Sequence, residues 1–130
     1  MSGFLSLLRV ELMVDAHGNN LCNRDERQLW QVIDDDFVYQ SDIAKQSIIV
    51  PSGFVTDFAS IPQVCLSIFG EIAQRPSVIH DFLYSKTLIT RAMADAVLLE
   101  AMEITGVSWL QRKLIYTGVR IGGGNHYGTS

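Results

Sequence analysis

The sequence predicts an α+β fold, a short antiparallel β-meander followed by about three helices. Short apolar runs closed by turn residues occupy residues 1–60, whereas helix start and stop signals recur through residues 61–121. A block of strands followed by a block of helices is typical of the α+β class. At 130 residues the chain is expected to be a single domain, with residues 122–130 as a tail.

Four apolar runs are expected to form the strands: 7–14, 29–33, 37–39 and 47–50. The acidic turn Asp34-Asp35-Asp36 separates the second run from the third and suggests a hairpin there. Because each run is short and ends at turn residues, we expect antiparallel rather than parallel pairing.

Capping signals place the three helices. Pro76 suits a first helical turn, which predicts a helix over 76–86. Thr90 can cap a second helix over 91–104, which Gly106 ends. Ser108 and Gln111 form a capping-box pattern for a third helix that stops at the glycines 122–124. The tail after it is expected to be mobile or to serve at an interface.

Composition limits the function classes. Apolar residues make up 48% and charged residues 18% of the chain, and the net charge is −4. This is a globular balance without the basic stripe of a nucleic-acid binder, so we expect no nucleic-acid partner. Cys22 and Cys65 have no metal or redox spacing and are expected to be free thiols rather than a bridge. No run is long enough for a membrane span or a signal peptide, which predicts a cytoplasmic protein.

The strongest chemical signal lies in two predicted helices. On the first helix His80 and Tyr84 share a face, and Asp81 points about 100° away. On the second helix Asp95 lies among apolar neighbours, where a carboxylate needs a partner. Two partners are open, Arg91 on the same helix and His80 across an antiparallel helical hairpin.

A His80–Asp95 pair has two interpretations. A carboxylate on one imidazole nitrogen fixes the tautomer and raises the basicity of the ring, so that the other nitrogen can take a proton from water. Asp81 could then hold a hard cation such as calcium to polarise a carbonyl. Alternatively, the pair ties two helices together and Tyr84 is a core residue with a satisfied hydroxyl.

The loop over residues 50–62 leads from the predicted sheet to the helices. Gly53 allows a tight turn, and Thr56 and Ser60 supply hydroxyls. Asp57 could act as a ligand beside Asp81, which would place a carboxylate and a carbonyl over His80. The alternative is an ordinary cap and turn ahead of the next helix.

Three segments resemble one known family. They are Val-Pro-Ser-Gly-Phe-Val-Thr-Asp-Phe-Ala-Ser-Ile-Pro at 50–62, Val-Ile-His-Asp-Phe-Leu-Tyr at 78–84 and Ala-Asp at 94–95. Together they resemble a family of short phage and prophage proteins known as a domain of unknown function, number thirteen-fifty-three, over about residues 30–123. The resemblance implies a place in the host cytoplasm or in the phage particle, and implies no reaction.

A local pattern resembles the core of secreted phospholipase A2. His-Asp-x-x-Tyr on one helix with an Asp on the next implies that His80 is the general base and Asp81 a calcium ligand. It further implies that Asp95 orients the histidine and that Tyr84 is a supporting phenol. The chain lacks that family's flanking disulfide cysteines, and its loop has Gly53 and Asp57 in place of a glycine-rich calcium loop.

Two classes of function follow. The first is a metal-assisted hydrolase of ester or amide bonds in lipid or cell wall, acting in phage entry or lysis. The second is a non-enzymatic component of the virion or of tail assembly, or an inhibitor of a host protein, docking through a sheet edge, the tail or an apolar surface. Trp30 and Trp109 are expected to be core or interface anchors. A hydrolase should keep His80 partly open in a cleft, whereas a structural protein can bury it under Tyr84 and Leu83.

Overall fold

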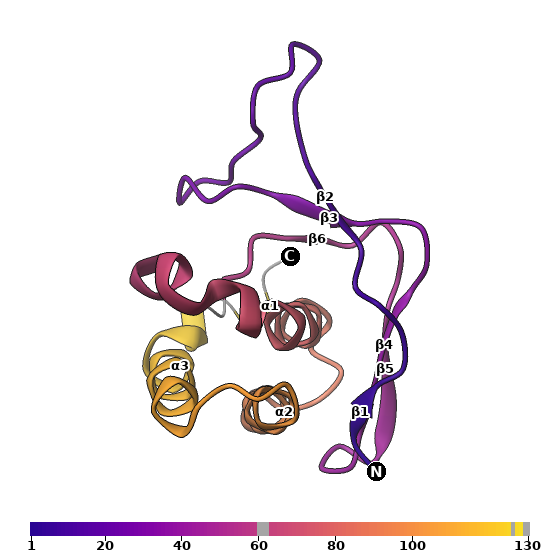
Figure 1. The fold of residues 1–130 in the computed structure, drawn as a ribbon, viewed down its shortest axis with the longest axis vertical. Coiled ribbons are helices and arrows are strands. Elements are labelled where there is room, and N and C mark those ends of the chain that lie inside the picture. Colours follow the sequence, from indigo (N-terminus) through magenta and orange to yellow (C-terminus); the bar gives the residue numbers. More distant parts are fainter. Residues whose placement is uncertain (60–62, 126, 129–130) are drawn as a thin grey trace.

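The structure is a computed structural model that describes residues 1–59, 63–125 and 127–128, and only the backbone of residues 63–71 and 125. Within these residues, two small antiparallel sheets in the N-terminal half are followed by three α-helices (Figure 1). The α+β class predicted from the sequence is therefore confirmed.

Six short strands form the two sheets of the described chain. One sheet has the order β1-β4-β5, with β1 at Gly3–Phe4, β4 at Phe37–Ser41 and β5 at Gln46–Val50. The other has the order β2-β3-β6, with β2 at Val10–Leu12, β3 at Trp30–Val32 and β6 at Val55–Thr56. All the pairs are antiparallel, as expected.

The single meander and the hairpin at residues 34–36 are wrong. β3 and β4 belong to different sheets, and the turn between them includes Asp34 with a φ of 67°. β1 and β6 were not predicted, because two-residue strands are too short to show an alternating pattern. They become strands only because β4 and β3 offer free edges to pair with.

The segment between β2 and β3 projects away from the helices as a long hairpin-like arm (Figure 1). Two isolated bridges hold the arm together, Val14 with Asn20 and Cys22 with Gln28. Cys22 is exposed there as a free thiol, whereas the side chain of Cys65 lies outside the described residues.

The helices are α1 at Gln63–Lys86, α2 at Arg91–Ile104 and α3 at Trp109–Gly122, followed by the short 3-10 helix η1 at Gly123–Asn125. The Thr90 side chain accepts from the Met93 amide, and Ser108 and Gln111 form the full capping box. The predicted starts of α2 and α3 are thus confirmed. None of the helices described is long and apolar enough to cross a membrane.

The predicted start of α1 at Pro76 is wrong. The helix begins at Gln63 and contains Pro76 in its interior. Proline has a helix-compatible φ, but it removes the backbone hydrogen bond to the residue four positions earlier. A proline inside a helix and a proline in a first turn give the same sequence signal, and here the longer helix continues through it.

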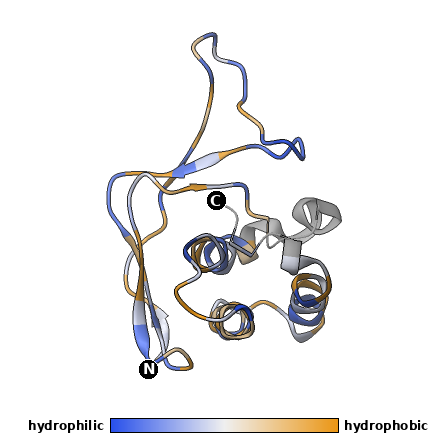
Figure 2. Ribbon diagram, turned by 180° about the vertical axis from the view of Figure 1, so that it is seen from behind, coloured by the Kyte–Doolittle hydropathy of each residue, from blue (hydrophilic) through white to orange (hydrophobic). Residues whose placement is uncertain are grey.

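The hydrophobic core lies between the inner face of the β4–β5 sheet and helices α1 and α2. β4 alternates buried and half-buried residues, and Phe37 and Tyr39 are fully buried. Val50, Ile79 and Leu98 meet them from β5, α1 and α2 and are at most 1% exposed. In Figure 2 much of the projecting arm has hydrophilic colour, with hydrophobic stretches between, and the helices carry both colours.

The described part of the C-terminal tail packs against α1 and the connection that follows it. The Tyr127 hydroxyl donates to the Ile89 carbonyl over 2.7 Å, and the Gly128 amide donates to the Tyr84 carbonyl over 2.9 Å. The Tyr127 ring also meets the Tyr84 ring edge-on, with centroids 5.3 Å apart.

Candidate functional site

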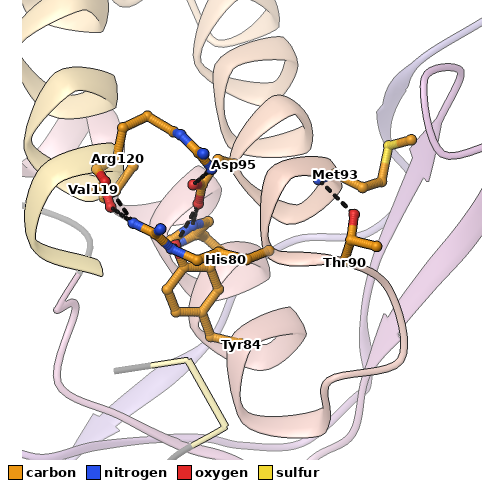
Figure 3. Close-up of polar contacts among 8 residues, drawn as sticks. His80, Tyr84, Thr90, Met93, Asp95, Val119 and Arg120 are labelled. Atoms are coloured by element: carbon orange, nitrogen blue, oxygen red, sulfur yellow. Dashed lines mark hydrogen bonds and ion pairs between the residues drawn. The ribbon is translucent and has the colours of Figure 1, made fainter. Parts of the chain in front are cut away.

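His80 and Asp95 form the predicted pair at the contact between α1 and α2. His80 Nε2 lies 2.6 Å from Asp95 Oδ1 (Figure 3). The short connection of residues 87–90 places the two helices side by side, which brings the pair together across 15 positions of sequence. Of the two partners that the sequence left open for Asp95, the structure selects His80.

Tyr84 is the third member of this group. One helical turn after His80, it lies on the same face of α1, as predicted, and its hydroxyl donates to Asp95 Oδ1 over 2.5 Å. The rings of His80 and Tyr84 are 4.0 Å apart between centroids. Tyr84 therefore holds the carboxylate from the same side as the imidazole does.

Arg120 completes the group from α3 and was missed by the sequence analysis. Its Nη1 donates to Asp95 Oδ2 over 2.7 Å. A cation in the last turn of a helix ordinarily complements the helix dipole, so the sequence gave no sign that Arg120 reaches another helix. Arg91, the alternative partner of Asp95, instead donates to the Tyr84 hydroxyl and to the carbonyls of α3 residues Val119 and Arg120 (Figure 3).

The charge state of Asp95 follows from these partners. Burial alone would raise the pKa of this carboxyl, but hydrogen bonds from His80, Tyr84 and Arg120 outweigh burial and hold the pKa below its ordinary value of 3.8. Burial and the hydrogen bond to Asp95 raise the pKa of Tyr84 to about 12. Asp95 is therefore a carboxylate and Tyr84 a neutral donor at neutral pH, and the carboxylate favours a proton on the His80 Nε2 that it binds.

A cavity of about 1030 Å³ lies beside the His80–Asp95 pair. Its walls come from the projecting arm, from the loop before and after β6, and from the last turns of α1. Five of the eight predicted site residues line it: Gly53, Thr56, Asp57, Asp81 and Tyr84. The structure thus brings the predicted loop and the predicted helix face to one cavity.

A hydrolase was expected to keep His80 partly open in a cleft and a structural protein to bury it, and in the structure His80 is buried. Its side chain is 2% exposed, Asp95 is fully buried, and neither residue lines the cavity. The physical reason is the packing of α1 against α2, which encloses the ring with Asp95 and Tyr84. Ser60, the remaining predicted residue, lies outside the described residues.

Asp81 fastens the loop to α1. Its Oδ2 accepts from the Thr56 hydroxyl over 2.5 Å and from the Ala59 amide over 3.3 Å. Asp57 is held by the arm instead, because its Oδ2 accepts from Asn23 Nδ2 over 2.5 Å. The loop that the sequence placed near His80 is therefore tied both to α1 and to the arm.

Calcium was expected at Asp81 and Asp57 and takes six to eight oxygen ligands, mostly carboxylates and carbonyls. In the structure Asp81 Oδ2 accepts two hydrogen bonds. Among the described residues no three His, Cys, Asp or Glu side chains gather as metal ligands.

One comparison with known proteins gives a match. No curated protein and no solved structure matches the chain. The model of the family described as "Protein of unknown function (DUF1353)" matches residues 30–119, more than half of the chain. This range contains β3 to β6, the cavity loop, the His80–Asp95 pair and most of α3. The chain belongs to the DUF1353 family.

Proposed function

We propose that the chain is a hydrolase of carboxylic ester or amide bonds in which His80 is the general base. The observation that carries the proposal is the bonding of the His80 ring by Asp95, with the same carboxylate held by Tyr84, which lines a cavity. A histidine oriented by a carboxylate through one nitrogen is the arrangement that general-base catalysis requires.

Each residue has a separate role in this reaction. Asp95 fixes the ring with the proton on Nε2, and Tyr84 and Arg120 fix Asp95. His80 takes one proton from water while the water oxygen bonds to the substrate carbonyl carbon. The imidazolium then returns this proton to the departing alkoxide or amine, so that an acid and an alcohol or amine are formed.

The proposal requires access to a ring that is 2% exposed. Two neighbours of His80 on α1, Asp81 and Tyr84, line the cavity, and we propose that substrate reaches the ring past them. Because Arg120 already pairs with the charge of Asp95, Asp95 acts as a positioning residue for His80.

The setting that we propose is a phage or prophage. It is supported by the resemblance of residues 50–62, 78–84 and 94–95 to short phage and prophage proteins. A hydrolase of lipid or cell-wall bonds would there serve entry or lysis.

The test is hydrolysis of labelled phospholipid vesicles and of soluble carboxylic esters by the purified protein, with added calcium and with a chelator. We expect turnover that His80→Gln lowers by about 10²–10⁴-fold, the usual contribution of a general base. Ser77→Ala is the matched control, because Ser77 is a buried residue one turn earlier on α1 whose hydroxyl has no hydrogen-bond partner among the described residues. Equal turnover in the wild type and in His80→Gln would exclude His80 as the base.

A second candidate is a non-enzymatic component of a virion or of tail assembly, or an inhibitor of a host protein. The burial of His80 favours it, because a fully enclosed His–Asp pair also serves to join helices. In that case no substrate turns over, and His80 reacts with diethyl pyrocarbonate only as fast as the protein unfolds. In a hydrolase, diethyl pyrocarbonate should instead modify His80 under native conditions, and turnover should be lost in parallel.

A further inference from the structure

The outer face of α3 exposes four large apolar side chains. Trp109 is 64%, Leu110 62%, Leu114 52% and Ile121 83% exposed. The opposite face packs against α2 and buries Ile115 and Val119. In Figure 1, α3 lies on the side of the helices away from the β1-β4-β5 sheet.

The exposed apolar residues form one stripe. With about 100° per residue, Leu110, Leu114 and Ile121 fall within roughly 40° of one another around the helix axis. Trp109, Lys113 and Arg120 fall within another arc of roughly 40° along one edge of this stripe. Lys113 Nζ lies 5.5 Å from the centre of the Trp109 ring, so the cation and the indole share this edge.

The charge of α3 is opposite to that of the whole chain. The chain carries a net charge of −4, whereas α3 contains Arg112, Lys113 and Arg120 and no carboxylate. Because Arg120 pairs with Asp95, Arg112 and Lys113 supply the uncompensated positive charge of α3. Such a helix is attracted to an anionic surface even though the chain as a whole is acidic.

We infer that α3 is a docking face for an anionic lipid surface, on which the helix lies flat. An apolar stripe bordered by a tryptophan and a lysine, here Trp109 and Lys113, resembles helices that bind in the headgroup region, with the apolar side chains below it. Cations near an anionic leaflet strengthen such binding.

A second copy of the chain fits this face less well. Two α3 helices that packed antiparallel about a two-fold axis would place the same edge of each stripe together. Lys113 would then face the cations of the other copy, and like charges in contact are unfavourable. The charge of α3 thus favours anionic lipid over self-association.

The test measures sedimentation of the protein with vesicles of phosphatidylglycerol and with vesicles of phosphatidylcholine alone, at low and high salt. Sedimentation measures binding and requires no turnover, so its outcome is independent of whether the protein is a hydrolase. We expect binding to the anionic vesicles that high salt weakens, and a partition coefficient roughly tenfold or more lower for Leu110→Ser combined with Leu114→Ser.

Charge variants supply the second arm. Lys113→Glu should weaken binding to anionic vesicles severalfold, whereas Lys45→Glu makes the same change of net charge at an exposed site away from α3 and should not. The melting temperatures of all variants should match, because the changed side chains are exposed. Equal binding to both kinds of vesicle, no binding, or a dimer in sedimentation velocity that Leu114→Ser dissolves would overturn the inference.

Discussion

Arg120 Nη1 lies 2.7 Å from Asp95 Oδ2, and this ion pair joins the last turn of α3 to the middle of α2. His80 and Tyr84 bind the other oxygen of the same carboxylate from α1. One buried carboxylate therefore receives donors from the two helices that flank its own. Because a buried charge without partners is costly, this carboxylate stabilises one arrangement of the three helices over others.

Loss of Asp95 should cost more stability than loss of Arg120. Asp95→Ala leaves His80 and Tyr84 buried without their acceptor and should lower the free energy of unfolding by about 3–5 kcal/mol. Arg120→Met should cost about 1–3 kcal/mol, because the Arg120 side chain is 38% exposed and water replaces part of the pair. Urea unfolding followed by circular dichroism measures both.

The control for Arg120 is Lys113→Met, which removes an exposed cation from the same helix and should change stability by less than about 0.5 kcal/mol. If Arg120→Met were as neutral as this control, the ion pair would contribute nothing to the packing of α3.

Glu100 should join α2 to the turn between β4 and β5. Its carboxylate accepts from the Tyr39 hydroxyl over 2.7 Å, from the Ser41 hydroxyl over 2.9 Å and from the Ile43 amide over 2.9 Å. Glu100→Ala leaves these donors without their acceptor and should cost about 1–3 kcal/mol. Glu103→Ala, one turn later at an exposed position, is the control, and equal unfolding midpoints for the two variants would contradict this role.

Protonation of Asp95 and Glu100 should lower the stability of the fold in acid. Hydrogen bonds outweigh burial and hold the pKa of Asp95 below 3.8 and that of Glu100 below 4.5 in the folded chain. The unfolded chain therefore binds protons first, so the stability they contribute is present above these ordinary values and is lost as pH falls through the lower folded values.

The measurement is urea unfolding between pH 6 and the acid limit of folding. Asp95→Asn and Glu100→Gln should each make the decline below about pH 4.5 shallower than in the wild type. If the stability of the double variant fell with pH as steeply as that of the wild type, other groups would be responsible for the loss of stability in acid.

Gly123 should tolerate no side chain, although it follows directly on Gly122. A Cβ atom at Gly123 would lie 2.7 Å from the Tyr84 hydroxyl, whereas one at Gly122 would meet nothing within 4 Å. Gly123→Ala should therefore displace Tyr84 from Asp95 and cost about 1–3 kcal/mol. Gly122→Ala, at the end of α3, should be neutral or stabilise by up to about 1 kcal/mol. Equal melting temperatures for the two alanine variants would show that Tyr84 can move away from a Cβ atom at position 123 without loss of stability.

The local parts of the fold could be predicted from the sequence. Thr90 and the Ser108–Gln111 box fixed the starts of α2 and α3, because a cap is satisfied by backbone groups two or three residues away. The start of α1 was wrong because Pro76 is compatible with both a first turn and an interior position. The division into two sheets was missed because strand partners are chosen over long sequence distances.

The sequence by itself determined that His80 and Tyr84 share a helix face and that the short connection to α2 brings Asp95 close to them, because both relations follow from helix periodicity and loop length. Only the tertiary structure decided that Asp95 pairs with His80 rather than Arg91, that Arg120 neutralises Asp95, that Gly123 leaves room for Tyr84 and that His80 is enclosed. Those outcomes depend on how α2 packs against α1 and on how α3 and η1 meet Asp95 and Tyr84, and no local spacing in the chain encodes that packing.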